Sequence, residues 1–220
     1  MVILTFKNVC AGYGRYEILH NINFSMDKGE FVGIIGPNGS GKSTLLKTAA
    51  KILKTTSGNI LLKNMDINKI SLQKFAKTIA FLPSDIEITY PYTVKELLSM
   101  ARYPFTGIVR NLSRKDLEII AYVTEQMELT MFMERTIFQM SEGEKQRVML
   151  AQCLVQEPEI ILLDEPTAHL DIGFQFSFLD LLKRYQKNFS LSILAVLHDL
   201  NLASQYCNKL VLLDRGGVSI

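Results

Sequence analysis

A glycine-rich stretch between an apolar run and an apolar-striped segment constrains this chain more than any other feature. Residues 33–46 read GIIGPNGSGKSTLL and match the spacing G-x-x-x-x-G-K-[ST]. The glycines let the backbone turn its N–H groups toward phosphate oxygens, the lysine offers a positive charge to the β and γ phosphates, and the serine hydroxyl suits Mg²⁺. We therefore expect a run of nucleotide-binding residues: Gly36, Pro37, Asn38, Gly39, Ser40, Gly41, Lys42, Ser43 and Thr44.

The hydrophobic pattern around this loop predicts alternating strands and helices. Residues 18–26 alternate and indicate a half-exposed strand whose apolar side carries Ile18, Ile22, Phe24 and Met26. Three continuous apolar runs are typical of strands covered on both faces of a parallel sheet: EFVGII at 30–35, EIILLD at 159–164 and SILAVLHD at 192–199. Helices are expected over 42–53 and 116–126. The pattern predicts an α/β core with a twisted, mainly parallel sheet and an N-terminal antiparallel β flap.

The stretch between Pro91 and Arg135 has no strong strand run but shows three helix starts. These are TVKE at 93–96, SRKD at 113–116 and TMFME at 130–134. We interpret 85–135 as a helical lobe inserted into one domain that spans 1–220. The catalytic core is then formed by 1–84 and 136–220, and 220 residues leave little room for a second domain.

Charge and cysteine content narrow the function classes. The formal net charge is +2, and lysines and arginines are spread along the chain, so no basic face for nucleic acid is expected. The cysteines, Cys10, Cys153 and Cys207, lie far apart, which argues against a zinc site or a disulfide framework. No stretch approaches eighteen uncharged apolar residues, and the first residues lack a signal-peptide pattern. We expect a chain that neither spans a membrane nor is secreted.

A pair of acids ends one of the apolar runs. Asp164 and Glu165 follow EIILL, and ligands of α/β folds bind at the carboxyl edge of the sheet. In such a place Asp164 would hold Mg²⁺ through its water shell, and Glu165 would orient or deprotonate an attacking water. An ordinary acidic pair on the surface is the alternative for these two residues taken alone.

The segment QMSEGEKQRVMLAQCL at 139–154 resembles the signature of ATP-binding cassette (ABC) ATPases. The usual form is Leu-Ser-Gly-Gly-Gln, and its places are taken here by Met140, Ser141, Glu142, Gly143 and Glu144. Ser141 and Glu144 also have the spacing of a capping box, so a helix start with exposed N–H groups is expected there. A capped helix without a further role is the alternative for this stretch alone.

Further marks of the same family follow in order along the chain. Asp171 in AHLD stands at the D-loop aspartate, His198 in LHDL at the switch histidine, and Tyr13 in AGYG where an aromatic ring commonly stacks on adenine. The resemblance implies a P-loop NTPase fold of the ABC-ATPase type, with ATP and Mg²⁺ as cofactors. The catalytic residues that it implies are Lys42, Glu165 and His198.

The resemblance also implies a second copy of the chain as partner. In a head-to-tail dimer ATP lies between the phosphate loop of one copy and the signature of the other. On the signature side the resemblance places Ser141, Gly143, Glu144 and the D-loop Asp171. One chain carries one phosphate loop and one signature, so a complete site needs two chains.

The segment TVKELLSMARYPFTG at 93–107 resembles cassette subunits of the iron–siderophore, haem and vitamin B12 importer group. This implies an ATP-hydrolysing subunit, bound at the cytoplasmic face of the cell membrane to a separate permease and served indirectly by a substrate-binding protein. An exporter-type cassette or a soluble ABC ATPase is the alternative. Relatives in this group commonly run on beyond the position of Ile220.

Two places depart from the family pattern. FLPSD at 81–85 carries Ser84 where the family has a glutamine that reaches Mg²⁺, so the expected metal set is Ser43, Asp164 and Ser84. The shorter serine would act through a bridging water, or the neighbouring Asp85 would take the metal contact. The signature has acids where glycine and glutamine are usual, which predicts less tight closure around ATP.

Overall fold

The computed structural model describes residues 1–85, 88–107, 111–168 and 170–219, and in them it contains two sheets. The smaller sheet is antiparallel. Its strands, in spatial order, are β2 (Tyr16–Asp27), β1 (Val2–Tyr13), β4 (Thr55–Leu62) and β5 (Met65–Asp66). This sheet is the expected N-terminal flap. No helix in the described part of the chain is long and apolar enough to cross a bilayer.

The larger sheet is parallel except at one edge, where β10 runs against β9. Its order is β10 (Gly217–Ser219), β9 (Lys209–Asp214), β3 (Phe31–Ile35), β8 (Ser192–Val196), β7 (Ile160–Asp164) and β6 (Ile79–Leu82). Every residue of β7 and β8 is buried, which confirms strands covered on both faces. The predicted α/β fold with a mainly parallel sheet is therefore confirmed.

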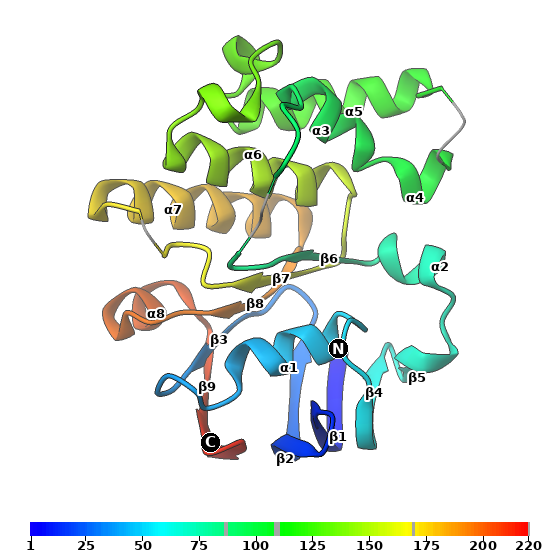
Figure 1. The fold of residues 1–220 in the computed structure, drawn as a ribbon, viewed down its shortest axis with the longest axis vertical. Coiled ribbons are helices and arrows are strands. Elements are labelled where there is room, and N and C mark those ends of the chain that lie inside the picture. Colours follow the sequence, from blue (N-terminus) through cyan, green and yellow to red (C-terminus); the bar gives the residue numbers. More distant parts are fainter. Residues whose placement is uncertain (86–87, 108–110, 169, 220) are drawn as a thin grey trace.

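Two hydrophobic cores lie on opposite faces of the larger sheet. One is formed with the antiparallel sheet and α1 (Lys42–Ala49), which lies between the two sheets (Figure 1). The other is formed with α3 (Val94–Met100), α5 (Arg114–Gln126), α6 (Glu142–Val155) and α7 (Ile172–Phe189), which lie above the sheet in Figure 1, and with α8 (Leu200–Tyr206). Alternate residues of β7 face the two cores, with Leu162 in the first and Leu163 in the second.

Two details of the predicted pattern are wrong. Ile18 is only half-buried, and Leu19 takes the inward place, because the pairing of β1 and β2 slips near Asn21, whose φ is +51°. This irregularity reverses the alternation on one side of it. The helix expected to reach Leu53 ends at Ala49, and Lys51 beyond it has φ +59°.

The helix starts expected in the lobe are partly confirmed. Thr93 and Ser113 cap α3 and α5 with complete capping boxes. Thr130 begins only a short 3-10 helix, Thr130–Phe132, and α4 (Tyr103–Thr106) was not expected. The remaining short elements are α2 (Leu72–Ala76) and two further 3-10 helices, Ile67–Lys69 and Ile137–Gln139. Helix α6 of the core packs against α3 and α5, and the boundaries of the 85–135 lobe stay a prediction.

A buried arginine just before α4 joins α5 to the end of α6. Arg102 is 2% exposed; its Nε donates to Asp116 Oδ1 at 2.8 Å, and its Nη1 donates to the carbonyl of Val155 at 2.7 Å. The guanidinium also lies over the Phe105 ring, 3.9 Å from its centre. A buried charge is tolerated only when it is paired and hydrogen-bonded. The guanidinium of Arg102 meets this condition, because its several donors reach both an anion and a carbonyl while its plane packs on a ring.

We predict that Asp116→Ala lowers the free energy of unfolding by about 3 kcal/mol, because Arg102 is left buried with one fewer anion. The matched control is Glu118→Ala on the same helix. Glu118 pairs with Arg114, which is 94% exposed, so its loss should cost less than about 1 kcal/mol. Urea unfolding followed by circular dichroism measures both. Equal losses for the two variants would contradict the structural role of Arg102.

Candidate active site

The glycine-rich loop follows β3 and turns directly into α1. Gly36 has φ +148°, and a Cβ there would collide with the carbonyl oxygen of Leu213 on the neighbouring strand. Gly41 has φ +101° and occupies the cap position of α1. Both positions need glycine for backbone reasons, and the loop places the start of α1 at the carboxyl end of β3. The sequence prediction of a strand, loop and helix is confirmed here.

Lys42 is held over this loop. It is 5% exposed, and its Nζ donates to the carbonyl oxygens of Gly36 and Pro37 at 3.0 Å each. Ser40 and Thr44 are buried, while Asn38 and Gly39 are exposed. The hydroxyl of Ser40 finds no hydrogen-bond partner within the described residues. The loop therefore presents one fixed cation and an exposed turn at the helix start, which is an arrangement suited to phosphate.

Ser43 and Asp164 meet across 121 positions of sequence. The hydroxyl of Ser43 donates to Oδ1 of Asp164 at 3.0 Å, and Asp164 is 1% exposed. Burial raises the pKa of the Asp164 carboxyl; the Ser43 hydrogen bond opposes this, and the charges of Glu165 and Asp85 add to it. Oδ2 of Asp164 is buried and has no hydrogen-bond partner within the described residues. An oxygen-preferring divalent cation suits this donor set.

Glu165 and His198 lie in direct contact. His198 Nε2 and Glu165 Oε1 are 2.6 Å apart, and both side chains are partly exposed. Glu165 has φ +52°, in the left-handed region that a residue with a side chain seldom adopts. Such strain at a non-glycine residue is typical of functional sites. The sequence placed these two residues after two different strands, and the structure brings their side chains together.

One cavity of about 510 Å³ gathers most of the expected nucleotide-binding and catalytic residues. Its walls are formed by the phosphate loop and by side chains from β1, β2 and the ends of β7 and β8. The lining residues are Tyr13, Ile18, Asn38, Gly39, Gly41, Lys42, Ser43, Thr44, Glu165 and His198. Ile18 was not expected in the site, and the alternating pattern gave no signal for it. The volume lies within the range usual for small-ligand sites.

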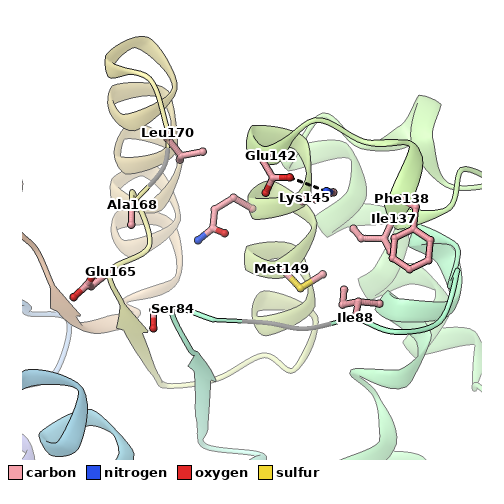
Figure 2. Close-up of a pocket in the computed structure, with 11 residues that line it drawn as sticks. Ser84, Ile88, Ile137, Phe138, Glu142, Lys145, Met149, Glu165, Ala168 and Leu170 are labelled. Carbon is pink, nitrogen blue, oxygen red and sulfur yellow. Dashed lines mark hydrogen bonds and ion pairs between the residues drawn. The ribbon is translucent and has the colours of Figure 1, made fainter.

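Ser84 lines a second cavity, of about 220 Å³, together with Glu165 (Figure 2). The Ser84 hydroxyl donates to Oδ2 of Asp85 at 3.5 Å. Figure 2 shows Ser84 and Glu165 on one side of this pocket and Glu142, with Lys145, on the other. The structure thus brings Ser84 close to the Glu165 end of the site, and the charges of Glu165 and then of Asp85 add to the raised pKa of Asp164.

The signature residues form the capped start of α6. Ser141 Oγ donates to Oε2 of Glu144 at 2.8 Å, and the Ser141 N–H donates to the same oxygen at 2.8 Å. These hydrogen bonds hold the pKa of Glu144 below its usual range. Glu142 pairs with Lys145 at 2.7 Å. The capping box that the sequence predicts is therefore present.

The signature and D-loop residues do not join the phosphate-loop cavity. Ser141, Gly143, Glu144 and Asp171 are absent from its described lining. Asp171 caps α7 by accepting from the Phe174 N–H at 3.0 Å. Within one chain the structure therefore brings together the phosphate loop, Asp164, Glu165 and His198, and leaves the signature elsewhere.

Comparison with known proteins identifies the family of this chain. Residues 19–168 match the family model described as ABC transporter. FhuC of Bacillus subtilis (strain 168), an iron(3+)-hydroxamate import ATP-binding protein, is 38% identical over 98% of this chain and 80% of its own length. FpuC of Bacillus anthracis, a petrobactin import ATP-binding protein, is 39% identical over 97% of this chain and 79% of its own. The uncharacterized B. subtilis protein YvrA is 38% identical, and this chain spans 48% of its length.

A solved structure supports the same assignment. The dimeric structure of MJ0796, a bacterial ABC transporter cassette, superposes with a TM-score of 0.85 at 28% identity, covering 99% of this chain and 97% of that one. The family model covers more than half of this chain, and the curated relatives align over nearly all of it. The chain therefore belongs to the ABC transporter ATP-binding proteins, the ATP-hydrolysing cassettes of that family.

Proposed function

We propose that this chain binds ATP with Mg²⁺ and hydrolyses it in a head-to-tail dimer, energising import of an iron complex through a separate permease. The observation that carries the catalytic part is the single cavity that holds the phosphate loop, Glu165 and His198. The cargo class is supported by the two relatives named for import of iron(3+)-hydroxamate and of petrobactin. Haem or cobalamin would be an alternative cargo of the same machinery.

Phosphate and metal would be held by groups at the carboxyl edge of the larger sheet. Lys42, whose Nζ donates to the carbonyl oxygens of Gly36 and Pro37, would place its ammonium on the β and γ phosphates. Ser43 and Asp164 would hold Mg²⁺, and the unpartnered Oδ2 of Asp164 supports this. The ion would neutralise charge on the phosphates and so lower the barrier to attack. Tyr13, 48% exposed on the cavity wall, would stack on the adenine.

Glu165 would act on the attacking water. Its carboxylate lies in the cavity beside His198, so the imidazole can orient it and can share a proton with it. The left-handed backbone at Glu165 turns the chain sharply at the end of β7. The two successive acids would therefore take different roles, since Asp164 is buried toward Ser43 and Glu165 lines the cavity.

The dimer is supported by where the signature lies. Ser141 is exposed and lines no part of the described phosphate-loop cavity, so it would complete the site of a second copy. A relative of known structure forms a dimer. A membrane-bound position of the chain, on the cytoplasmic face, follows from the proposed permease, and a substrate-binding protein would deliver the iron complex on the other side.

Lys42→Ala should lower the ATPase rate at least about 100-fold, because the transition-state charge on the phosphates loses its fixed cation. The same substitution in the chromosomal copy should abolish uptake of a radiolabelled ferric hydroxamate. The control is Lys54→Ala, an exposed lysine just beyond α1. Loss of hydrolysis with normal uptake would refute the import function and leave the ATPase standing.

Glu165→Gln should bind ATP without turning it over and should therefore accumulate as a dimer with Mg²⁺ and ATP. Size-exclusion chromatography with light scattering measures the mass. The same variant carrying Ser141→Arg is the matched control, because a bulky cation at the exposed cap would block closure while leaving the phosphate loop unchanged. A monomer of Glu165→Gln at millimolar ATP would contradict the sandwich.

Asp85 and Ser84 differ in their expected effect on metal use. Because Asp85 would take the metal contact that a glutamine makes in the family, Asp85→Ala should raise the Mg²⁺ concentration for half-maximal hydrolysis by about tenfold, the loss of one charge-assisted contact. Ser84→Ala should change it by less than about twofold. Ser84→Gln, with the longer amide, should raise turnover. If Asp85→Ala matches an exposed control such as Glu125→Ala, Asp85 has no part in the metal site.

A further inference from the structure

Gln146 lies on the signature helix and reaches the catalytic segment of the same chain. It is the fifth residue of α6, partly buried, and its Nε2 donates to the carbonyl oxygen of Pro166 at 2.8 Å. Pro166 follows Glu165 directly. Gln146 also lines the cavity that Glu165 and Ser84 share. Neither the sequence pattern nor the roles proposed above use this side chain.

The backbone at Glu165 needs such support. A side-chain-bearing residue at φ +52° persists only where its surroundings hold it. The next residue is a proline, which has no N–H, so the peptide between the two cannot be fixed by donation from that nitrogen. The described hydrogen bonds on this turn include the Ala168 N–H to the Glu165 carbonyl at 3.0 Å and the Gln146 amide to the Pro166 carbonyl. The second one comes from another element.

A second contact joins the signature helix to α7, the helix that follows the catalytic segment. The ring of Phe174, on the first turn of α7, lies over Gly143 so closely that a Cβ there would be 2.8 Å from a ring carbon. Gln175 Nε2, one residue on, donates to the carbonyl oxygen of Leu170 at 2.9 Å. Figure 2 shows the segment with Glu165, Ala168 and Leu170 facing α6 across the pocket. The start of the signature helix thus contacts the catalytic segment at Pro166 and the first turn of α7 at Phe174, and Gln175 ties α7 to Leu170.

We propose that Gln146 is a positioning residue for hydrolysis: by holding the Pro166 carbonyl, it fixes Glu165 relative to the signature helix. This rests on the proposed ATPase dimer. In that dimer Ser141 and Gly143 contact the nucleotide of the second copy, while Glu165 serves the nucleotide of its own copy. Through Gln146, the position of Glu165 at the ATP of its own copy would then depend on whether the signature has closed on the ATP of the second copy.

The experiment compares three variants by steady-state ATPase assay. Gln146→Leu loses the donor and ends the side chain one atom earlier. The kcat should fall at least about tenfold while KM for ATP stays within about twofold, because a misplaced base affects the chemical step. Gln146→Lys restores a donor of similar reach and should recover kcat to within about threefold of wild type. Gln73→Leu is the matched control: Gln73 Nε2 donates to the carbonyl of Pro104 at 3.1 Å, outside the site, and its loss should leave kcat unchanged.

Two results would overturn the proposal. One is a Gln146→Leu enzyme with wild-type kcat, and the other is a Gln146→Lys enzyme as slow as Gln146→Leu, since a restored donor would then be without effect. Adding Gln146→Leu to Glu165→Gln should leave the ATP-dependent dimer intact, and its loss would also count against the proposal. Failure of the proposed function would give a different result: the wild-type protein and Lys42→Ala would then hydrolyse ATP at equal rates.

Discussion

The hydrogen bond from Ser43 to Asp164 is the contact on which the arrangement of the site depends. It joins the first turn of α1 to the last residue of β7, at 3.0 Å, with the carboxylate 1% exposed. Burial of a carboxylate is costly unless it is paired or hydrogen-bonded. One oxygen has the Ser43 hydroxyl, and the other has no partner within the described residues. A cation bound next to Asp164, where the phosphates would lie, would therefore stabilise this buried carboxylate.

The order of strands explains why one edge can hold every part of this site. The neighbours β3, β8, β7 and β6 are parallel, so their carboxyl ends lie together. The residues that follow these ends come from far apart in the sequence: Gly36 after β3, His198 after β8, Glu165 after β7 and Ser84 after β6. A parallel sheet with crossover helices thus brings functional residues from four short segments to one edge.

Local pattern was enough to predict the parts of this molecule that depend on local chemistry. The loop around Lys42, the buried strands and the capping boxes at Thr93, Ser113 and Ser141 follow from short-range spacing, and they are confirmed. The inward place of Leu19 was missed because a slip in the pairing with β1 decides it. The contact of Gln146 with Pro166 was missed for a similar reason, since a glutamine on a helix carries no signal of what lies opposite.

The two acids of the signature, Glu142 and Glu144, would repel the phosphates of ATP less on dimer closure than two free carboxylates. Glu142 is paired with Lys145, and the Glu144 carboxylate accepts from both the N–H and the hydroxyl of Ser141, so each charge is met locally. A glutamine at 144 could accept only through its amide oxygen, and a carboxylate forms the stronger cap. The consequence falls on the hydroxyl of Ser141, which is already donating to Glu144. To donate to a phosphate, that hydroxyl must turn away from the carboxylate, and the exchange of one anion for another makes the net gain small.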